Sequence, residues 1–308
     1  MLTLIRGSGC EVVEVDKSKV RKGMLSSLIP GLSSLSQRGL AGWLVVLGFI
    51  MVTSIVVVTA ISPWVVPYNP SQINVGRPLL SPNSQFLFGT NNMGQDVFSR
   101  VLSGGGIMLE VSILSVMICL LIGVPIGLLS SYVGGIFDRF LCLIMDSIYA
   151  FPGLVLAIAI AAMLGRGVTN MAISIAVVYV PSYFRVIRSQ VLSIKEMPYV
   201  EAAKAAGAKG RTVLSRYIFP NVVPSIVVVA TVNFADAILT AAGLTFIGLG
   251  VPVDIPDWGW DLTNGSRLLS SGAWWVIAYP GLMIILLALG FTLMGEGLSE
   301  MANPRLRE

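Results

Sequence analysis

Hydrophobic residues in this chain gather in long stretches that contain no Asp, Glu, Lys or Arg. These stretches cover residues 39–76, 111–137, 147–165, 167–184, 217–235, 237–253 and 268–295. A helix that crosses the hydrocarbon core of a bilayer needs about 20 mostly apolar residues. Joining the two stretches beside Asp236 predicts six membrane-spanning helices, at residues 40–62, 107–131, 140–164, 168–187, 221–250 and 274–295.

The composition strengthens this interpretation. Of the 308 residues, 55% are hydrophobic and 12% are charged, and the mean hydropathy is +0.83. Soluble globular proteins usually carry about 25% charged residues. The sequence therefore predicts an all-α polytopic membrane protein with six transmembrane helices.

The net charge of +4 follows the predicted topology. With the N-terminus inside, the cytoplasmic segments are 1–39, 132–139, 185–217 and 298–308. They contain 16 of the 20 Lys and Arg residues, which is the positive-inside distribution of membrane proteins. We therefore expect both termini to be cytoplasmic, and the basic charge needs no nucleic-acid partner to explain it.

Several kinds of chemistry are excluded by the residues themselves. The chain has no histidine, and its three cysteines, Cys10, Cys119 and Cys142, show no CxxC spacing, so we expect no metal site. The phosphate-binding pattern GxxxxGK[ST] is absent, because GAKGRT (207–212) has the wrong spacing. No Ser/His or paired-Asp arrangement supports an intramembrane hydrolase. We expect a protein that is not an enzyme and binds no cofactor itself.

One long segment between two apolar runs is both charged and helix-prone: residues 199–224, YVEAAKAAGAKGRTVLSRYIFPNVVP. Residues 201–206 are strong helix formers. Gly207 follows them, and glycine readily adopts the positive φ that ends a helix. The pattern predicts a helix, a glycine elbow and a second short helix on the Lys/Arg-rich side of the membrane.

This segment resembles the EAA loop of membrane subunits in binding-protein-dependent ABC importers. Glu-Ala-Ala is followed by Gly207 and then by Pro220, and residues 182–208 resemble the C-type permease of the dipeptide, oligopeptide and nickel group. The resemblance implies a coupling helix that docks on a cytoplasmic ATPase, with coupling residues Tyr199, Glu201, Ala202, Ala203, Ala206 and Gly207. From the residues alone, an interfacial amphipathic helix without a partner is the alternative.

Other segments carry the same resemblance. FGTNNMGQDVFSRVLSGG (88–105) resembles the family's FGTDxxGRDxxSRxxxG, a short interfacial helix under the docked binding protein, although Asn91 and Gln95 replace the usual Asp and Arg. ILTAAGLTFIGLGVP (238–252) resembles ILxEAxLSFLGLG, with Ala241 in place of the acid. Further matches are DSIYAFPGL (146–154), PDWGWDLTNG (256–265) and the closing NPRLR (303–307).

The resemblance implies the type I ABC importer permease fold. We expect no cleavable signal peptide, because the first apolar run starts too far into the chain. The expected organisation is a cytoplasmic tail (1–39), a first transmembrane helix with a long extracytoplasmic loop (40–106), a five-helix core (107–297) with the cytoplasmic coupling loop 195–220, and a second cytoplasmic tail (298–308).

The implied function is to form half of a translocation pathway for di- or oligopeptides in the inner membrane of a prokaryote. The implied partners are a second, B-type permease, two ABC ATPases that bind ATP and Mg, an extracytoplasmic substrate-binding protein and the lipid bilayer. Nickel chelates, glutathione and oligosaccharides are alternative cargoes of similar permeases. A self-sufficient secondary transporter is the alternative from another class.

Polar and proline residues within the predicted helices are the remaining candidates. Asn233 and Asp236 share a helical face, and either a substrate path or helix packing explains them. Asp146 lies nearer the cytoplasmic end, where a basic partner is available. Helix kinks are expected at Pro125, Pro152, Pro181 and Pro220.

Overall fold

The computed structural model describes residues 39–252 and 254–302, and its regular structure there is helical apart from one isolated bridge between Thr90 and Asp96. Five helical segments are long and apolar enough to cross a membrane: α3 (Leu40–Val65), α4 (Val97–Val133), α7 (Val168–Ile194), Gly210–Phe246 and α12 (Trp275–Ala302). A sixth span results if α5 (Gly135–Tyr149) and α6 (Gly153–Leu164) count as one. The expected all-α membrane protein is confirmed, with five or six candidate spans. The N-terminal tail, Cys10 and the closing NPRLR motif lie outside the described residues.

The helix α4 starts earlier than the sequence predicts, at Val97 rather than at residue 107. Asp96 caps it, because its carboxylate accepts a hydrogen bond from the backbone N–H of Ser99. Residues 97–105 were expected to form part of a separate interfacial helix, and that expectation is wrong. They are the first turns of a continuous helix of 37 residues.

The third predicted span is not one straight helix. α5 and α6 are bent by 89° at a short break, and Pro152 lies in that break as the N-cap residue of α6. Proline lacks a backbone N–H donor and disfavours the helical conformation of the residue before it, so the helix stops here.

The other three prolines behave differently. A kink was expected at Pro181, and α7 continues past it as one helix to Ile194. Pro125 lies inside the continuous helix α4. Pro220 is the second residue of α10 (Phe219–Phe246) and lies within the continuous helical segment Gly210–Phe246, where it removes one backbone N–H donor. A π-helical stretch, η2 (Val213–Ile218), precedes it and joins it to α9 (Gly210–Thr212).

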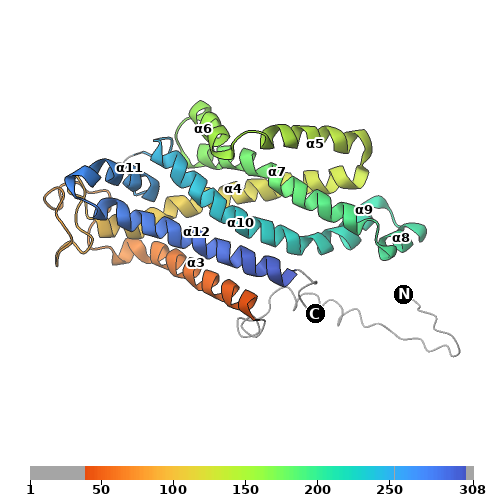
Figure 1. Ribbon diagram of the computed structural model, residues 1–308, viewed down its shortest axis with the longest axis horizontal. Coiled ribbons are helices and arrows are strands. Elements are labelled where there is room, and N and C mark those ends of the chain that lie inside the picture. Colours follow the sequence, from red (N-terminus) through yellow and green to blue (C-terminus); the bar gives the residue numbers. More distant parts are fainter. Residues whose placement is uncertain (1–38, 253, 303–308) are drawn as a thin grey trace.

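The helices α4, α7 and α10 run through the middle of the bundle, with α3 and α12 on one side and α5 and α6 on the other (Figure 1). At one end lie the short helices α8 (Pro198–Ala205) and α9. The opposite end holds α11 (Trp258–Leu268), the turn η3 (Leu269–Ser271) and the loop 66–96. We call this second region the polar layer.

Glycine lets α4 and α7 pack closely. A Cβ atom on Gly123 would lie 2.8 Å from Cβ of Tyr183, and one on Gly127 would lie 3.1 Å from the backbone oxygen of Phe184. Neither distance leaves room for a side chain without movement of α7. Small residues at helix interfaces allow backbones to approach in this way.

A matched pair of substitutions tests this packing. Gly123→Ala should overpack the interface, at a cost of about 1–3 kcal/mol, and should lower the thermal unfolding temperature of the detergent-purified chain by several degrees. Gly106→Ala is the control in the same helix, because its nearest neighbour, a methyl of Thr59, would be 3.9 Å away. Equal unfolding temperatures for the two variants would contradict the close packing.

Candidate functional site

The expected coupling segment folds into a short helix and a glycine turn. α8 begins after Met197 with Pro198 in its first turn, and Glu201 follows near its N-terminus. A carboxylate there interacts favourably with the helix dipole. At the other end Gly207 has φ +81°, and the N–H groups of Gly207 and Ala208 donate to the carbonyls of Lys204 and Ala203. This is the helix and glycine elbow that the pattern predicts.

One buried side chain holds α8 against the bundle. Val200 is fully buried in a cluster that includes Val191 and Ile194 of α7 and Val213 and Ile218 of η2. Sequence reasoning missed Val200, although an aliphatic residue amid Glu, Lys and Ala is a usable signal.

The other candidate residues point away from this anchor. Ala203 is half-buried, whereas the exposed ones are Tyr199, Glu201, Ala202, Ala206 and Gly207. The exposed surface of α8 therefore combines the small side chains of Ala202 and Ala205, which let another backbone approach closely, with the larger ones of Tyr199, Glu201 and Lys204.

The surroundings of α8 connect it to three long helices. Residues 195–197 join it to α7, and α9 with η2 joins it to α10. The Lys195 ammonium also donates to the backbone oxygen of Ser131, near the end of α4, at 3.2 Å. A displacement of α8 would therefore be passed to α7 and α10 directly.

Two ion pairs join α5 to α7. Arg188 donates two hydrogen bonds to the Asp138 carboxylate, at 2.9 and 2.6 Å, and the Ser130 hydroxyl donates a third at 2.7 Å. The expected basic partner of Asp146 is Arg185, whose guanidinium donates to one carboxylate oxygen at 2.8 Å. The first pair is largely shielded, whereas the side chains of the second are 45% and 62% exposed.

The structure separates the two polar residues of α10. Asn233 is buried, and its Nδ2 has no hydrogen-bond partner among the described residues. Asp236 is half-buried, and its backbone oxygen accepts a hydrogen bond of 3.4 Å from the Tyr179 hydroxyl. The expected shared polar face is therefore divided between an enclosed amide and a partly open carboxylate.

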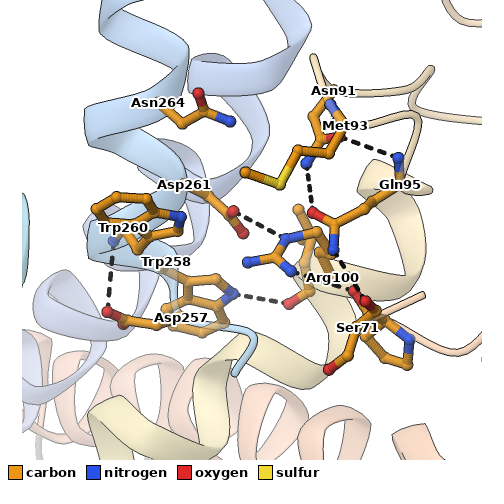
Figure 2. Close-up of polar contacts among 12 residues, drawn as sticks. Ser71, Asn91, Met93, Gln95, Arg100, Asp257, Trp258, Trp260, Asp261 and Asn264 are labelled. Atoms are coloured by element: carbon orange, nitrogen blue, oxygen red, sulfur yellow. Dashed lines mark hydrogen bonds and ion pairs between the residues drawn. The ribbon is translucent and has the colours of Figure 1, made fainter. Parts of the chain in front are cut away.

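The polar layer at the opposite end is organised around a buried arginine (Figure 2). The Arg100 side chain is 2% exposed and donates to Asp261 of α11 at 2.9 Å. A second N–H of Arg100 donates to the backbone oxygen of Pro70 at 3.1 Å. One side chain of α4 thus fixes both α11 and the loop. Removing one partner of a buried ion pair typically costs about 3–5 kcal/mol.

A buried tryptophan completes this junction. Trp258 is fully buried and donates from its indole N–H to the backbone oxygen of Val101 at 2.7 Å (Figure 2). Cβ atoms on Gly104 and Gly105 would lie 2.7 and 2.9 Å from its ring. The motifs 88–105 and 256–265 are therefore two halves of one packing arrangement.

Two acids of the polar layer are perturbed by burial. Asp257 caps α11 by accepting from the N–H groups of Gly259 and Trp260, and burial raises its pKa to about 6. Burial also raises the pKa of Asp261, against the opposing effect of the Arg100 guanidinium. Burial disfavours the charged form of a carboxyl group, so the Arg100 pair is the main compensation for the charge of Asp261.

The two departures from the family pattern in 88–105 contact each other. The Asn91 amide donates to Oε1 of Gln95 at 2.8 Å, and the Gln95 amide donates to the backbone oxygen of Ser71 at 3.2 Å (Figure 2). Both side chains are buried. A neutral amide pair therefore occupies the two positions where the pattern has Asp and Arg.

A double-mutant cycle tests this pairing. Asn91→Asp and Gln95→Arg should each destabilise the chain, because each places an uncompensated charge in a buried site, at about 3–5 kcal/mol. The double variant should unfold at a temperature closer to that of the original chain, since its two charges neutralise each other. Additive losses in thermal unfolding experiments would show that the two positions are independent.

Comparisons with known proteins agree with this architecture. A family model described as binding-protein-dependent transport system inner membrane component matches residues 123–308. A dipeptide transport system permease of Alkalihalophilus pseudofirmus is 36% identical over 264 residues, 86% of each chain. A probable D,D-dipeptide permease of Escherichia coli is 36% identical over 85% of this chain and 88% of its own length.

A third relative carries a different cargo in its name. A glutathione transport system permease of Pectobacterium atrosepticum is 38% identical over 73% of this chain and 75% of its own length. The family model covers more than half of the sequence, and the relatives cover most of it. The chain is therefore a multi-pass, non-catalytic transport subunit that belongs to the family of inner membrane components of binding-protein-dependent transport systems.

Proposed function

We propose that this chain is one of two membrane subunits of an ATP-driven importer of di- or oligopeptides. It would form half of the translocation pathway and couple that pathway to cytoplasmic ATPases through α8 and its glycine turn. The observation that carries the proposal is the structure of α8: Val200 is its one buried residue, and Ala202 and Ala205 are exposed.

This geometry suits transmission of a movement. Exposed alanines allow a groove on an ATPase to approach the α8 backbone, while Val200 ties that helix to α7 and η2. The π-helical turn η2 between α9 and α10 is a place where a helix adjusts its winding. Movement of docked ATPases would tilt α7 and α10 and change which side of the membrane the pathway faces.

The energy source would lie in partner subunits. The sequence has no phosphate-binding GxxxxGK[ST] motif, so ATP and Mg would bind to two ABC ATPases on the α8 side. Both chain termini would be cytoplasmic, in the inner membrane of a prokaryote. A second, B-type permease would complete the pathway, and no nucleic acid would take part.

The polar layer would face the extracytoplasmic substrate-binding protein. Arg100 and Trp258 tie the loop, α4 and α11 together there, so the surface is rigid enough to receive a docked protein. The two proposed partner surfaces would then lie at opposite ends of the bundle, where α8 and α11 are found (Figure 1).

Peptides are the favoured cargo because relatives named as dipeptide permeases match most of this chain. Glutathione is the second candidate, supported by the relative that is 38% identical. Membership of a binding-protein-dependent family argues against a self-sufficient secondary transporter.

Site-specific crosslinking tests the coupling role. In a background without Cys10, Cys119 and Cys142, Ala206→Cys should crosslink to an ATPase subunit in membranes, with a yield that changes when ATP is added. ATP binding moves the ATPases, and Ala206 is an exposed residue at the end of α8.

Two control positions define the contact surface. Val200→Cys is buried in the same helix, and Ser270→Cys is exposed at the opposite end of the bundle, so neither should give the adduct. If Ala202→Cys and Ala206→Cys both fail to react with a co-expressed ATPase, α8 is an interfacial helix without this partner.

A further inference from the structure

One face of α7 is polar, although the helix is long enough to cross a membrane. The spacing of its polar residues, three or four positions apart, places them along one side of the helix. They are Tyr179, Ser182, Arg185, Ser189 and Ser193, and we call them the α7 stripe. The last three are exposed and the first two half-buried.

The opposite side of α7 is apolar and enclosed. Four of its side chains are at most 1% exposed where α7 packs on α4: Tyr183, Phe184, Ile187 and Val191. The α7 stripe is therefore the open side of the helix. It is the side that a partner, lipid or water must cover.

Charge argues against lipid on this side. The α7 stripe carries Arg185, and Asp146 and Tyr149 of α5 lie beside it. Arg185 begins the predicted cytoplasmic segment 185–217, and exposed charges near the end of a spanning helix usually face water or another protein rather than lipid hydrocarbon. By contrast α3, whose outer surface is also exposed, contains no charged residue at all.

Arg185 has spare hydrogen-bonding capacity. Its guanidinium donates once to Asp146, at 2.8 Å, and its carbon lies 4.1 Å from the centre of the Tyr149 ring. A guanidinium has five N–H donors, so most of them are open to another acceptor. The neighbouring Arg188 differs, because Asp138 accepts two of its hydrogen bonds in a mostly shielded pair.

The acceptor of Arg185 borders an open hollow of about 570 Å³. Arg185 does not line this hollow itself and adjoins it through Asp146. The other lining residues are Arg139, Cys142, Leu143, Ser147, Ala150 and Arg188. Three arginines and two aspartates surround this region: Arg139, Arg185 and Arg188 with Asp138 and Asp146. The balance is one positive charge, which favours an anionic group.

We propose that Arg185 binds the carboxylate of the transported substrate as it passes along the α7 stripe. The substrate carboxylate would replace Asp146 as the acceptor, in the two-bond geometry that arginine forms with carboxylates. Tyr149 would hold the guanidinium plane during the exchange. The hydroxyls of Ser182 and Ser193 would meet the amide groups of the substrate, because those of Tyr179 and Ser189 already bond to Thr240 and to the backbone oxygen of Val186. This inference rests on the proposed import function and adds a substrate requirement, a free carboxylate.

Transport by the assembled complex in liposomes tests the requirement. The rates of ATP-dependent uptake are measured for a dipeptide and for its C-terminal amide, each supplied as a saturating complex with the same binding protein. The ratio of the two rates is compared between variants, so any preference of the binding protein cancels. Arg185→Gln should lower the ratio by at least about tenfold, the effect of losing a hydrogen bond to a charged group.

Three further variants separate recognition from structure. Asp146→Asn should keep the preference for the free carboxylate, because Arg185 remains. The double variant Arg185→Gln/Asp146→Asn should lack the preference, although no unpaired acid is left behind. Arg166→Gln is the control: this exposed arginine donates to the backbone oxygen of Gly248, in another part of the bundle, and its removal should leave the ratio unchanged.

Each contrary result has a distinct meaning. Equal slowing of both peptide forms by Arg185→Gln, or a normal preference in the double variant, would show that Arg185 is structural and overturn the inference. An Arg185→Gln effect seen in vesicles with phosphatidylglycerol but not in pure phosphatidylcholine would assign the site to a lipid headgroup instead. Absence of ATP-dependent uptake by the original complex would refute the proposed function rather than this site.

Discussion

The close packing of α4 on α7 is the interaction on which the rest of this structure depends. α4 has 37 residues and a length of about 55 Å, so it reaches from one end of the bundle to the other. At one end Arg100 and Asp96 organise the polar layer, and at the other end the backbone of Ser131 meets Lys195 beside α8. Because Gly123 and Gly127 let α7 lie directly on this long helix, the polar side of α7 must face outward.

The three ion pairs found within residues 39–252 and 254–302 differ in burial, and burial determines what each of them can do. Arg100 and Asp261 are enclosed, so losing either partner would leave a buried charge, and the pair is suited to a permanent junction. Arg185 and Asp146 are open to their surroundings, where an ion pair contributes only about 0–1 kcal/mol. A weak, accessible pair can exchange its partner for a ligand. Arg188 and Asp138 lie between these limits and hold α5 against α7.

The coupling segment and the polar layer differ in how many buried side chains hold them in place. α8 is fixed by a single buried valine, and most of its remaining residues are exposed, which suits a surface that follows a moving partner. The polar layer is fixed by Arg100, Trp258 and the Asn91–Gln95 amide pair, all buried. The end expected to receive a binding protein is therefore rigid, whereas the end expected to meet the ATPases is held to the bundle mainly by the side chain of Val200.

The sequence by itself determined the membrane class, most of the span positions and the turn at Gly207, because each depends on a local property. Hydrophobic length, low charge content and the conformational freedom of glycine act within a few tens of residues. The break at Pro152 was also expected from the sequence, but only the tertiary structure decided its angle of 89°, the passage of α7 through Pro181, the anchoring role of Val200 and the partner of Asp146. These features depend on what lies opposite in space: Arg185 is 39 residues from Asp146, and Asp261 is 161 residues from Arg100. No local pattern records such pairings, because packing between helices creates them.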